Sequence, residues 1–326
     1  MSLGVAIPFW LDRPDEEAVE IARAADRAGI QTVWVGEMAT FDAFALATAI
    51  GLQTARVRLK VGPLAVGVRS PVAIALGVSS VATLVGRSVD VALGASSPAI
   101  VSGWHDRPWS GLAGHMREGV AALRTLLDGE RIDVSGNHVR ARGFKLRRPQ
   151  TEASITVAAF GPHMTRVGAR FADEVVLNLV TPEHVAVARA RIDAEAASAG
   201  RSCPGLAVWV PAALDPGERA LRQLAGQLAV YLGAPGYGEL FAGLGFGDLV
   251  DRARAGSGRA ELAGAVPSEL LERIGALGDS GQIAARVAAY HDAGADHVAI
   301  VPSTAEDPGG MRLLDAVTQL ERAARA

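Results

Sequence analysis

The sequence predicts an α/β fold, a (β/α)8 TIM barrel in which residues 1–326 form a single domain. Eight short, mostly apolar segments are spread from one end of the chain to the other. A nearly continuous apolar composition is typical of parallel strands that are buried on both faces. Longer helical patterns separate these segments, and that alternation predicts parallel strands joined by crossover helices. Eight units fit a closed barrel better than the alternative, an open doubly wound sheet.

The boundaries of the strands and helices follow from local signals. The predicted strands are Leu3–Pro8, Thr32–Gly36, Arg58–Leu64, Ser88–Gly94, Ser154–Ala159, Glu174–Leu179, Leu206–Pro211 and His297–Pro302. Between them, Ser70 and Pro71 suit the N-cap and the first position of a helix that Gly86 ends. Pro182 and Gly200 repeat this arrangement around a later helix.

Two segments interrupt the alternation. Residues Val134 to Lys145 alternate around the turn Ser135-Gly136-Asn137, which predicts a hairpin excursion after the fourth strand. Residues Gly233 to Gly264 are rich in glycine and predict an irregular or partly helical insertion after the seventh strand.

Composition narrows the possible functions. The hydrophobic fraction of 49% is ample for a large core, and the net charge of −3 does not favour a nucleic-acid or anionic-membrane partner. The one cysteine, Cys203, cannot build a disulfide framework or a cysteine metal site, which fits a reducing cytoplasm. The seven histidines show no metal-ligand spacing, so we expect no metal. The uncharged run Ser70–Gly86 is predicted to be a buried helix rather than a membrane span, and we expect a soluble protein.

The position of the active site follows from the fold, because barrels of this type place their chemistry in the loops after the strands. Those loops are rich in Gly, Ala and Ser and poor in ionisable groups. They hold no carboxylate pair for glycoside hydrolysis, and the chain lacks Walker, GxGxxG, GxSxG and HExxH motifs. The composition therefore predicts a site that positions a large planar ligand and leaves the chemistry to a cofactor.

Two turns with small residues favour a phosphorylated ligand. Gly94–Ser97 follow the fourth strand, and Ala158–Pro162 follow the fifth strand and lead directly into a helix. Small residues allow backbone N–H groups to approach an anion, and a helix N-terminus favours negative charge. A plain tight turn remains the alternative for either cluster.

Several motifs lie in a fixed order along nearly the whole chain. They are Arg58–Leu64 followed by Val68–Pro71, Gly86-Arg87 before Val91–Gly94, Gly103–His105, Val157–Pro162, Ala172-Asp173, and Ala289-Tyr290 with Ala293–Asp296. In this order they resemble the luciferase-like flavin and deazaflavin oxidoreductases, especially the branch that uses coenzyme F420. Each motif alone is weak, but their order and spacing together are fairly specific.

The resemblance implies an oxidoreductase that transfers a hydride between F420 and a small organic substrate. An FMN-dependent monooxygenase of the same family and a homologue that binds cofactor without turnover remain alternatives. The chain departs from the family at two places. Glu37-Met38 stand where many relatives have Asp-His, and a family glutamate after the fourth strand is replaced near Ser97-Pro98. The resemblance therefore supports cofactor binding better than any particular acid–base chemistry.

The resemblance also implies roles for individual residues. A cis peptide is expected at Gly62–Pro63, behind the deazaflavin ring. The expected cofactor contacts lie at three strand ends: Gly62, Pro63, Leu64, Gly94, Ala95, Ser96, Ser97, Ala159, Phe160, Gly161 and His163. The expected substrate contacts are Phe9, Trp10, Met38 and Trp104. Glu37 is a predicted catalytic residue because its carboxylate stands directly at a strand's end, and His105 is the predicted substitute for the missing histidine.

A homodimer is expected from two helices without charge. The predicted helices Phe44–Ala55 and Pro71–Val85 contain no charged residue. A helix that is apolar all round is buried on all sides, whereas a barrel covers only one side. A second copy of the chain is therefore the expected partner, as the resemblance also implies.

Overall fold

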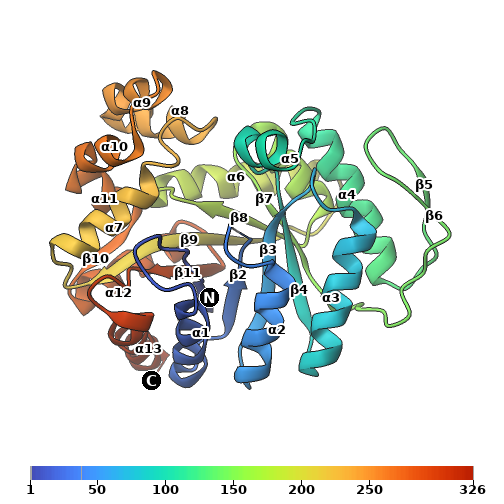
Figure 1. Cartoon of the computed structure of the whole chain (residues 1–326), viewed down its shortest axis with the longest axis horizontal. Coiled ribbons are helices and arrows are strands. Elements are labelled where there is room, and N and C mark those ends of the chain that lie inside the picture. The colour runs from blue at the N-terminus through green and yellow to red at the C-terminus, as the bar shows by residue number, and fades with distance from the viewer. Residues whose placement is uncertain (1, 38, 326) are drawn as a thin grey trace. The chain divides into compact units, whose positions relative to one another are not determined.

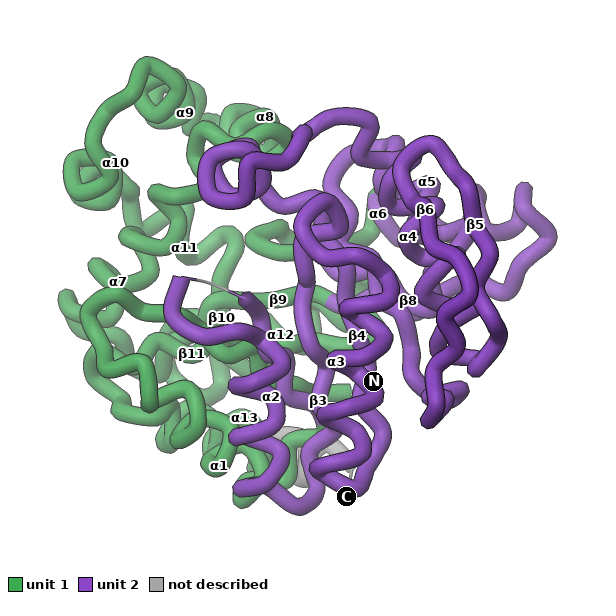
Figure 2. The backbone as a smooth tube through the Cα atoms, turned by 45° about the vertical axis from the view of Figure 1, so that its right-hand side comes forward, with its two compact units in different colours: residues 1–31, 177–187, 208–326 green, residues 32–176, 188–207 purple. Residues whose placement is uncertain are grey.

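The computed structural model of the chain describes residues 2–37 and 39–325, which form two compact units (Figure 2). The first unit comprises residues 1–31, 177–187 and 208–326, and the second comprises residues 32–176 and 188–207. Strands and helices alternate along the chain, and the strands pair in parallel with helices around them (Figure 1). The predicted fold class, a (β/α)8 barrel, is confirmed.

The second unit carries most of the predicted site. Its strands, in pairing order, are β2 (Thr32–Val35), β3 (Arg58–Ala65), β4 (Val89–Gly94), β7 (Ile155–Ala158) and the first part of β8 (Glu174–Asn178). Its helices are α2 (Ala43–Gln53), α3 (Pro71–Val85), the π-helical segment η1 (Ala99–Trp104), α4 (Leu112–Leu127), α5 (Pro162–Phe171) and the second part of α6 (Pro182–Ser198).

The first unit has the strand order β10-β9-β11-β1. These strands are β1 (Ser2–Ala6), β9 (Gly205–Leu214, from Val208 onward), β10 (Ala276–Gly278) and β11 (His297–Pro302). The main helices are α1 (Glu17–Ala28), α7 (Glu218–Leu228), α11 (Ser268–Ile274), α12 (Ser280–Asp292) and α13 (Met311–Arg325), with the short 3-10 turn η3 (Pro308–Gly310) before α13.

Each predicted strand overlaps a strand of the structure, and the helix signals are also confirmed. At α3, the Ser70 hydroxyl accepts a hydrogen bond from the N–H of Ala73 at 3.2 Å, and Pro71 takes the first helical position. Gly86 ends the helix with φ 76°, a left-handed conformation that glycine adopts without steric cost. The three-residue strand β10 was not predicted, because three residues are too few to show a pattern.

Both interruptions of the alternation are present. The hairpin consists of β5 (Asp133–Ser135) and β6 (Arg140–Arg142), which pair antiparallel. The insertion after β9 is largely helical and contains α8 (Tyr237–Phe241), the π-helical segment η2 (Ala242–Phe246), α9 (Gly247–Arg254) and α10 (Arg259–Ala265). Within the described residues, no helix combines the length and apolar character needed to cross a membrane.

The inward-facing side chains of the second unit include one polar cluster. The Lys60 ammonium lies 2.5 Å from the Glu174 carboxylate and 3.1 Å from the Thr156 hydroxyl. It also lies 4.5 Å from the ring centroid of Trp34, in a cation–π contact. Strands β3, β7, β8 and β2 each supply one of these residues, so the cluster ties four strands together. This pairing explains how a lysine occupies a buried strand.

Candidate active site

The carboxyl ends of β2, β3, β4 and β7 meet along one edge of the second unit. Val61 pairs with Val35 on one side, and Leu93 pairs with Leu64 and with Val157. The parallel register brings together three groups of predicted residues: Glu37, the Gly62–Leu64 segment, and the turns that begin at Gly94 and Ala159. Met38, a predicted substrate contact, lies outside the described residues.

The end of β3 carries a bulge. The register between β3 and β4 shifts between Val61 and Leu64, and the Gly62–Pro63 peptide is cis, as expected. Gly62 has φ 122°, and a Cβ atom there would overlap the carbonyl oxygen of Ala92, so the position requires glycine. Pro63 is half-buried, whereas Gly62 and Leu64 are buried. Pro63 is therefore the member of this trio that presents a surface to a ligand.

The turn after β4 lies against this bulge. A Cβ atom at Gly94 would lie 3.1 Å from the Cβ of Pro63 and 3.7 Å from that of Ala158, so the small residue lets three strand ends approach closely. Ser96 adopts a positive φ of 59°, which is uncommon for a residue other than glycine. The indole N–H of Trp109 donates to the Ala95 carbonyl at 3.2 Å and fixes the turn. This role of Trp109 was not predicted, because no motif links it to the turn at Ala95.

The turn after β7 opens helix α5. Gly161 is the N-cap residue, with φ 77° and ψ 169°, and Pro162 takes the first helical position. No side chain caps this helix, and a Cβ atom at Gly161 would meet nothing within 4 Å. The first N–H groups of an α-helix have no partner within the helix, so this open end is suited to an anion.

Barrels often bind phosphate after their last two strands, but here carboxylates occupy that position. In the first unit, Asp307 accepts hydrogen bonds from the N–H groups of Arg312 and Leu313 at the start of α13. Glu306 accepts from the N–H groups of Gly217 and Arg219 at the start of α7. These helix starts are therefore satisfied by the chain itself, which leaves the β7–α5 turn as the better anion site.

Glu37 is held by an arginine that the sequence analysis did not assign. The Arg69 Nε donates to Glu37 Oε2 at 3.2 Å, and its Nη2 bonds both Glu37 and Asp42. The Ala43 N–H also donates to Glu37, at 3.3 Å. The hydrogen bond that Arg69 donates to Glu37 raises the pKa of Arg69 against the opposing effect of burial. Burial acts to raise the pKa of Asp42, but hydrogen bonds from Ala45 and Arg69 outweigh it and lower that pKa.

Trp104 and His105 lie on the segment after β4, at the end of η1. Trp104 is 58% exposed, and His105 is exposed as well. Val101 anchors the inner side of the segment, because its side chain is buried. A methyl group of Val101 lies close to Gly67, since a Cβ atom added at Gly67 would be 3.4 Å from it. The segment thus packs on the loop after β3, the loop that also carries Arg69.

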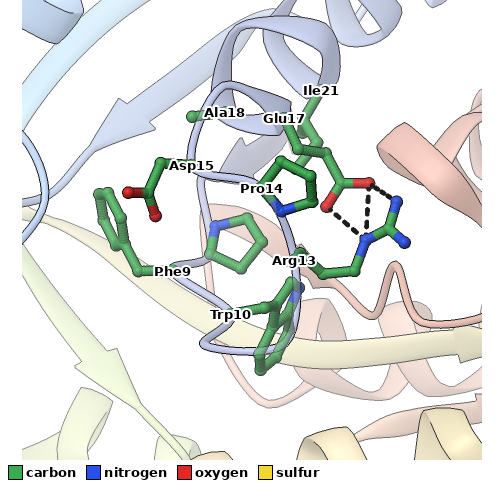
Figure 3. Close-up of a pocket in the computed structure, with 9 residues that line it drawn as sticks. Phe9, Trp10, Arg13, Pro14, Asp15, Glu17, Ala18 and Ile21 are labelled. Atoms are coloured by element: carbon green, nitrogen blue, oxygen red, sulfur yellow. Dashed lines mark hydrogen bonds and ion pairs between the residues drawn. The ribbon is translucent and has the colours of Figure 1, made fainter.

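Phe9 and Trp10 lie in the first unit, in the loop between β1 and α1 (Figure 3). Trp10 is 8% exposed, and its indole N–H donates to the Pro302 carbonyl at 3.0 Å. The adjacent pocket has a volume of about 10 Å³, too small for an organic substrate. The nearby Arg13–Glu17 ion pair also joins this loop to Thr304, whose hydroxyl donates to Glu17 at 2.7 Å. Phe9 points away from this ion pair and is half-exposed.

A larger pocket, of about 460 Å³, lies beside the β7–α5 turn in the second unit. His163, predicted to contact the cofactor, is exposed and lines it together with Phe160. The start of α4 and the hairpin complete its wall, so that the full lining is Gly111, Leu112, Ala113, Gly114, His138, Phe160, His163 and Met164.

These features define a (β/α)8 barrel with a candidate ligand site at the strand ends, built from a bulge, two small-residue turns and an uncapped helix. The model of the luciferase-like monooxygenase family matches residues 4–297, and the chain belongs to this family. The predicted family resemblance is therefore confirmed.

Three similar proteins are distant in sequence but align with nearly the whole chain. A Mycobacterium tuberculosis protein described as a coenzyme F420-dependent oxidoreductase is 24% identical, over 94% of this chain and 96% of the relative. The F420-dependent tetrahydromethanopterin reductase of Methanopyrus kandleri has a TM-score of 0.81 and 18% identity, covering 98% of this chain and 97% of its own. An F420-dependent secondary alcohol dehydrogenase, solved with an F420–acetone adduct, has a TM-score of 0.80 and 18% identity, covering 100% of this chain and 99% of its own.

Proposed function

We propose that the protein is an F420-dependent oxidoreductase that moves a hydride between the deazaflavin and a small organic substrate. The observation that carries this proposal is the bulge at the end of β3, where Pro63 keeps a partly exposed surface beside the turn at Gly94, together with the start of α5 at Gly161, which no side chain caps. The names of the relatives described above, which include F420-dependent reductases and a dehydrogenase, support the choice of cofactor.

The residues at the strand ends fit such a cofactor. The exposed surface of Pro63 would support the ring from behind, with Gly62 and Leu64 holding the bulge in place. The backbone groups of the two turns would bind the phosphodiester through Gly94, Ala95, Ser96, Ser97, Ala159, Phe160 and Gly161, and the His163 side chain would add a donor. When bound, the deazaflavin supplies or accepts the hydride at its ring.

Two side chains would complete the chemistry. Glu37, fixed by Arg69, would accept a hydrogen bond from the ring hydroxyl and set the orientation of the ring. His105 would exchange a proton with the substrate, because its loop follows β4 and packs on the loop after β3. Phe9, Met38 and Trp104 remain our proposed substrate contacts, whereas Trp10, which is buried and bonded to the Pro302 carbonyl, would support the loop that carries Phe9.

A turnover assay tests this proposal. Purified protein is mixed with reduced F420 and a panel of carbonyl compounds and activated alkenes, and with oxidised F420 and a panel of alcohols. We expect the deazaflavin absorbance to change with at least one substrate. Activity with reduced FMN and oxygen instead would establish the monooxygenase alternative. Binding of F420 without turnover on the whole panel would establish a cofactor-binding homologue.

We further propose that the protein acts as a homodimer of single-domain, cytoplasmic subunits. Helices α2 and α3 expose Leu52, Leu76 and Leu84, at 66%, 46% and 63% exposure. Phe44 of α2 fills the space above Gly77 of α3, so the two helices form one apolar surface. Leu76→Glu with Leu84→Glu should convert a dimer into a monomer, as measured by light scattering. A monomeric wild-type protein at micromolar concentration would contradict this proposal.

A further inference from the structure

Asn178, the last residue of β8, lies on the inner face of that strand. Successive side chains of a strand alternate between its two faces, so Glu174 and Asn178 share one face of β8. The Glu174 carboxylate faces inward, because it binds Lys60 and accepts a hydrogen bond from the Thr156 hydroxyl at 2.9 Å. Asn178 therefore occupies the inner face at the carboxyl end of β8, the end at which barrels of this type place their active sites.

Two tyrosines of the first unit gather around the Asn178 amide. The Asn178 Nδ2 donates to the Tyr237 hydroxyl at 3.4 Å, and a hydrogen bond with Asn178 also lowers the pKa of Tyr231. The two phenol rings pack together, with their centroids 4.9 Å apart and their planes inclined by 58°. Asn178, Tyr231 and Tyr237 thus form one polar cluster, in which each residue is half-buried.

The insertion after β9 holds the two tyrosines in place. Tyr237 is the first residue of α8, and its ring packs 6.3 Å from the ring of Phe241, which is fully buried. A Cβ atom at Gly238 would lie 2.9 Å from the Leu232 carbonyl oxygen, so this glycine lets α8 approach the segment that follows Tyr231. The fold therefore positions both phenols.

The cluster is uncharged at neutral pH. Burial raises the pKa of Tyr231, although the hydrogen bond with Asn178 opposes this rise. Burial and the neighbouring phenol raise the pKa of Tyr237 as well. Both phenols therefore keep their protons, and a protonated hydroxyl can donate one hydrogen bond while it accepts others.

A neutral donor at the end of a barrel strand suits a particular kind of substrate oxygen. The oxygen of a ketone, aldehyde or alcohol accepts a hydrogen bond without bringing a charge into the site. A carboxylate or phosphate would exchange its water for three neutral side chains, and burial of a charge without a counter-charge is costly.

We propose that the Tyr231 hydroxyl, positioned by Asn178, binds an uncharged oxygen of the substrate, and that this contact selects neutral ketones, aldehydes or alcohols over carboxylated or phosphorylated ones. This inference rests on the proposed function, because it takes the substrate to react at the carboxyl ends of the strands. Tyr231 is the contacting residue, whereas Asn178 and Tyr237 are positioning residues.

Two ketones of similar shape test this inference: cyclohexanone, which is neutral, and 4-oxocyclohexanecarboxylate, which carries a negative charge. Their dissociation constants are measured by NMR titration of the protein, both without cofactor and with F420. We expect the wild type to bind cyclohexanone at least about tenfold more tightly than the carboxylate. Tyr231→Phe should weaken cyclohexanone binding by about fivefold, the value of one neutral hydrogen bond, and Asn178→Leu should lose part of the same affinity.

Tyr290→Phe is the matched control. The buried Tyr290 hydroxyl shares its hydrogen bond between the carbonyls of Val180 and Ile274, at 2.7 and 3.0 Å. Its loss should lower the unfolding temperature and leave ketone affinity within about twofold. A second readout is the infrared C=O stretch of isotope-labelled cyclohexanone. This band should lie at lower frequency in the wild-type complex than in the Tyr231→Phe complex, because a hydrogen bond weakens the carbonyl double bond.

Each outcome decides the inference. It is overturned if the wild type binds no cyclohexanone with or without F420, if it binds both ketones equally, or if Tyr231→Phe matches it in affinity and infrared band. A loss of affinity in Tyr290→Phe as large as in Tyr231→Phe would show a structural effect and would also overturn it. If F420 does not bind, the proposed function fails, whereas the cofactor-free titrations still decide the oxygen contact.

Discussion

Arg69 and Glu37 form a two-point ion pair at the ends of β3 and β2, although 32 residues separate them in the chain. The planar guanidinium lies against both carboxylate oxygens, while the Ala43 N–H donates to one of them. Arg69 also lies 5.5 Å from the ring centroid of Phe44 and bonds Asp42, the N-cap residue of α2. The Glu37 carboxylate is thus held in one orientation at the candidate site, which suits it to accept a hydrogen bond from a ligand.

Arg69→Met should release the Glu37 carboxylate from its fixed position. We expect F420 affinity or the rate of hydride transfer to fall by about tenfold, close to 1.4 kcal/mol. Arg69→Lys should recover only part of the loss, because an ammonium cannot make the two-point contact. Asp42→Asn is the control, since asparagine can still cap α2 and Glu37 keeps its arginine. Wild-type behaviour of Arg69→Met in stopped-flow measurements would show that the ion pair has no role in the reaction.

Gly161→Val should weaken cofactor binding by about tenfold or more, because the new side chain would stand in open space at the proposed phosphate position. Its positive φ would also strain any other residue. Gly143→Val is a matched control, because Gly143 has φ 80° and open space around it but lies in the hairpin connection. If both variants lose affinity equally, the loss comes from backbone strain and the phosphate lies elsewhere.

Lys60→Met should lower the free energy of unfolding by about 3 kcal/mol, because it leaves the largely buried Glu174 carboxylate without its cation. Replacing both residues, as Lys60→Met with Glu174→Leu, should recover much of this loss. Urea denaturation followed by circular dichroism measures both effects. An unfolding midpoint in Lys60→Met equal to that of the wild type would indicate that the attraction between Lys60 and Glu174 only offsets the free energy needed to remove both charges from water.

The stability of the fold should decrease below pH 6.5 in part because of His115. Burial, together with the nearby His138, lowers the pKa of His115 from its ordinary value of 6.5. As the pH falls through 6.5, the unfolded chain therefore takes up this proton first, and the unfolded state gains stability until the folded pKa is passed. His115→Gln should flatten this part of the curve of unfolding free energy against pH. A curve of unchanged slope in the variant would contradict the assignment.

Much of the fold could be predicted because its signals are local. The eight strands appear as short apolar segments, and the Ser70-Pro71 start and Gly86 end of α3 are set by neighbouring residues. The cis Gly62–Pro63 bulge could be expected from its motif. The Arg69–Glu37 pair, the Trp109 contact and the His138 wall were missed, because each joins residues whose proximity depends on tertiary packing. For the Arg69–Glu37 pair, the one signal in the sequence was that a basic residue directly precedes the Ser70-Pro71 helix start.

We propose that the bulge at Gly62–Pro63 and the turns at Gly94 and Gly161 hold a deazaflavin. Parallel titration of the purified protein with F420 and with FMN tests it most directly. We predict saturable binding of F420, at least about tenfold tighter than that of FMN, a difference of roughly 1.4 kcal/mol. Tighter binding of FMN, or no saturable binding of F420, would contradict the account.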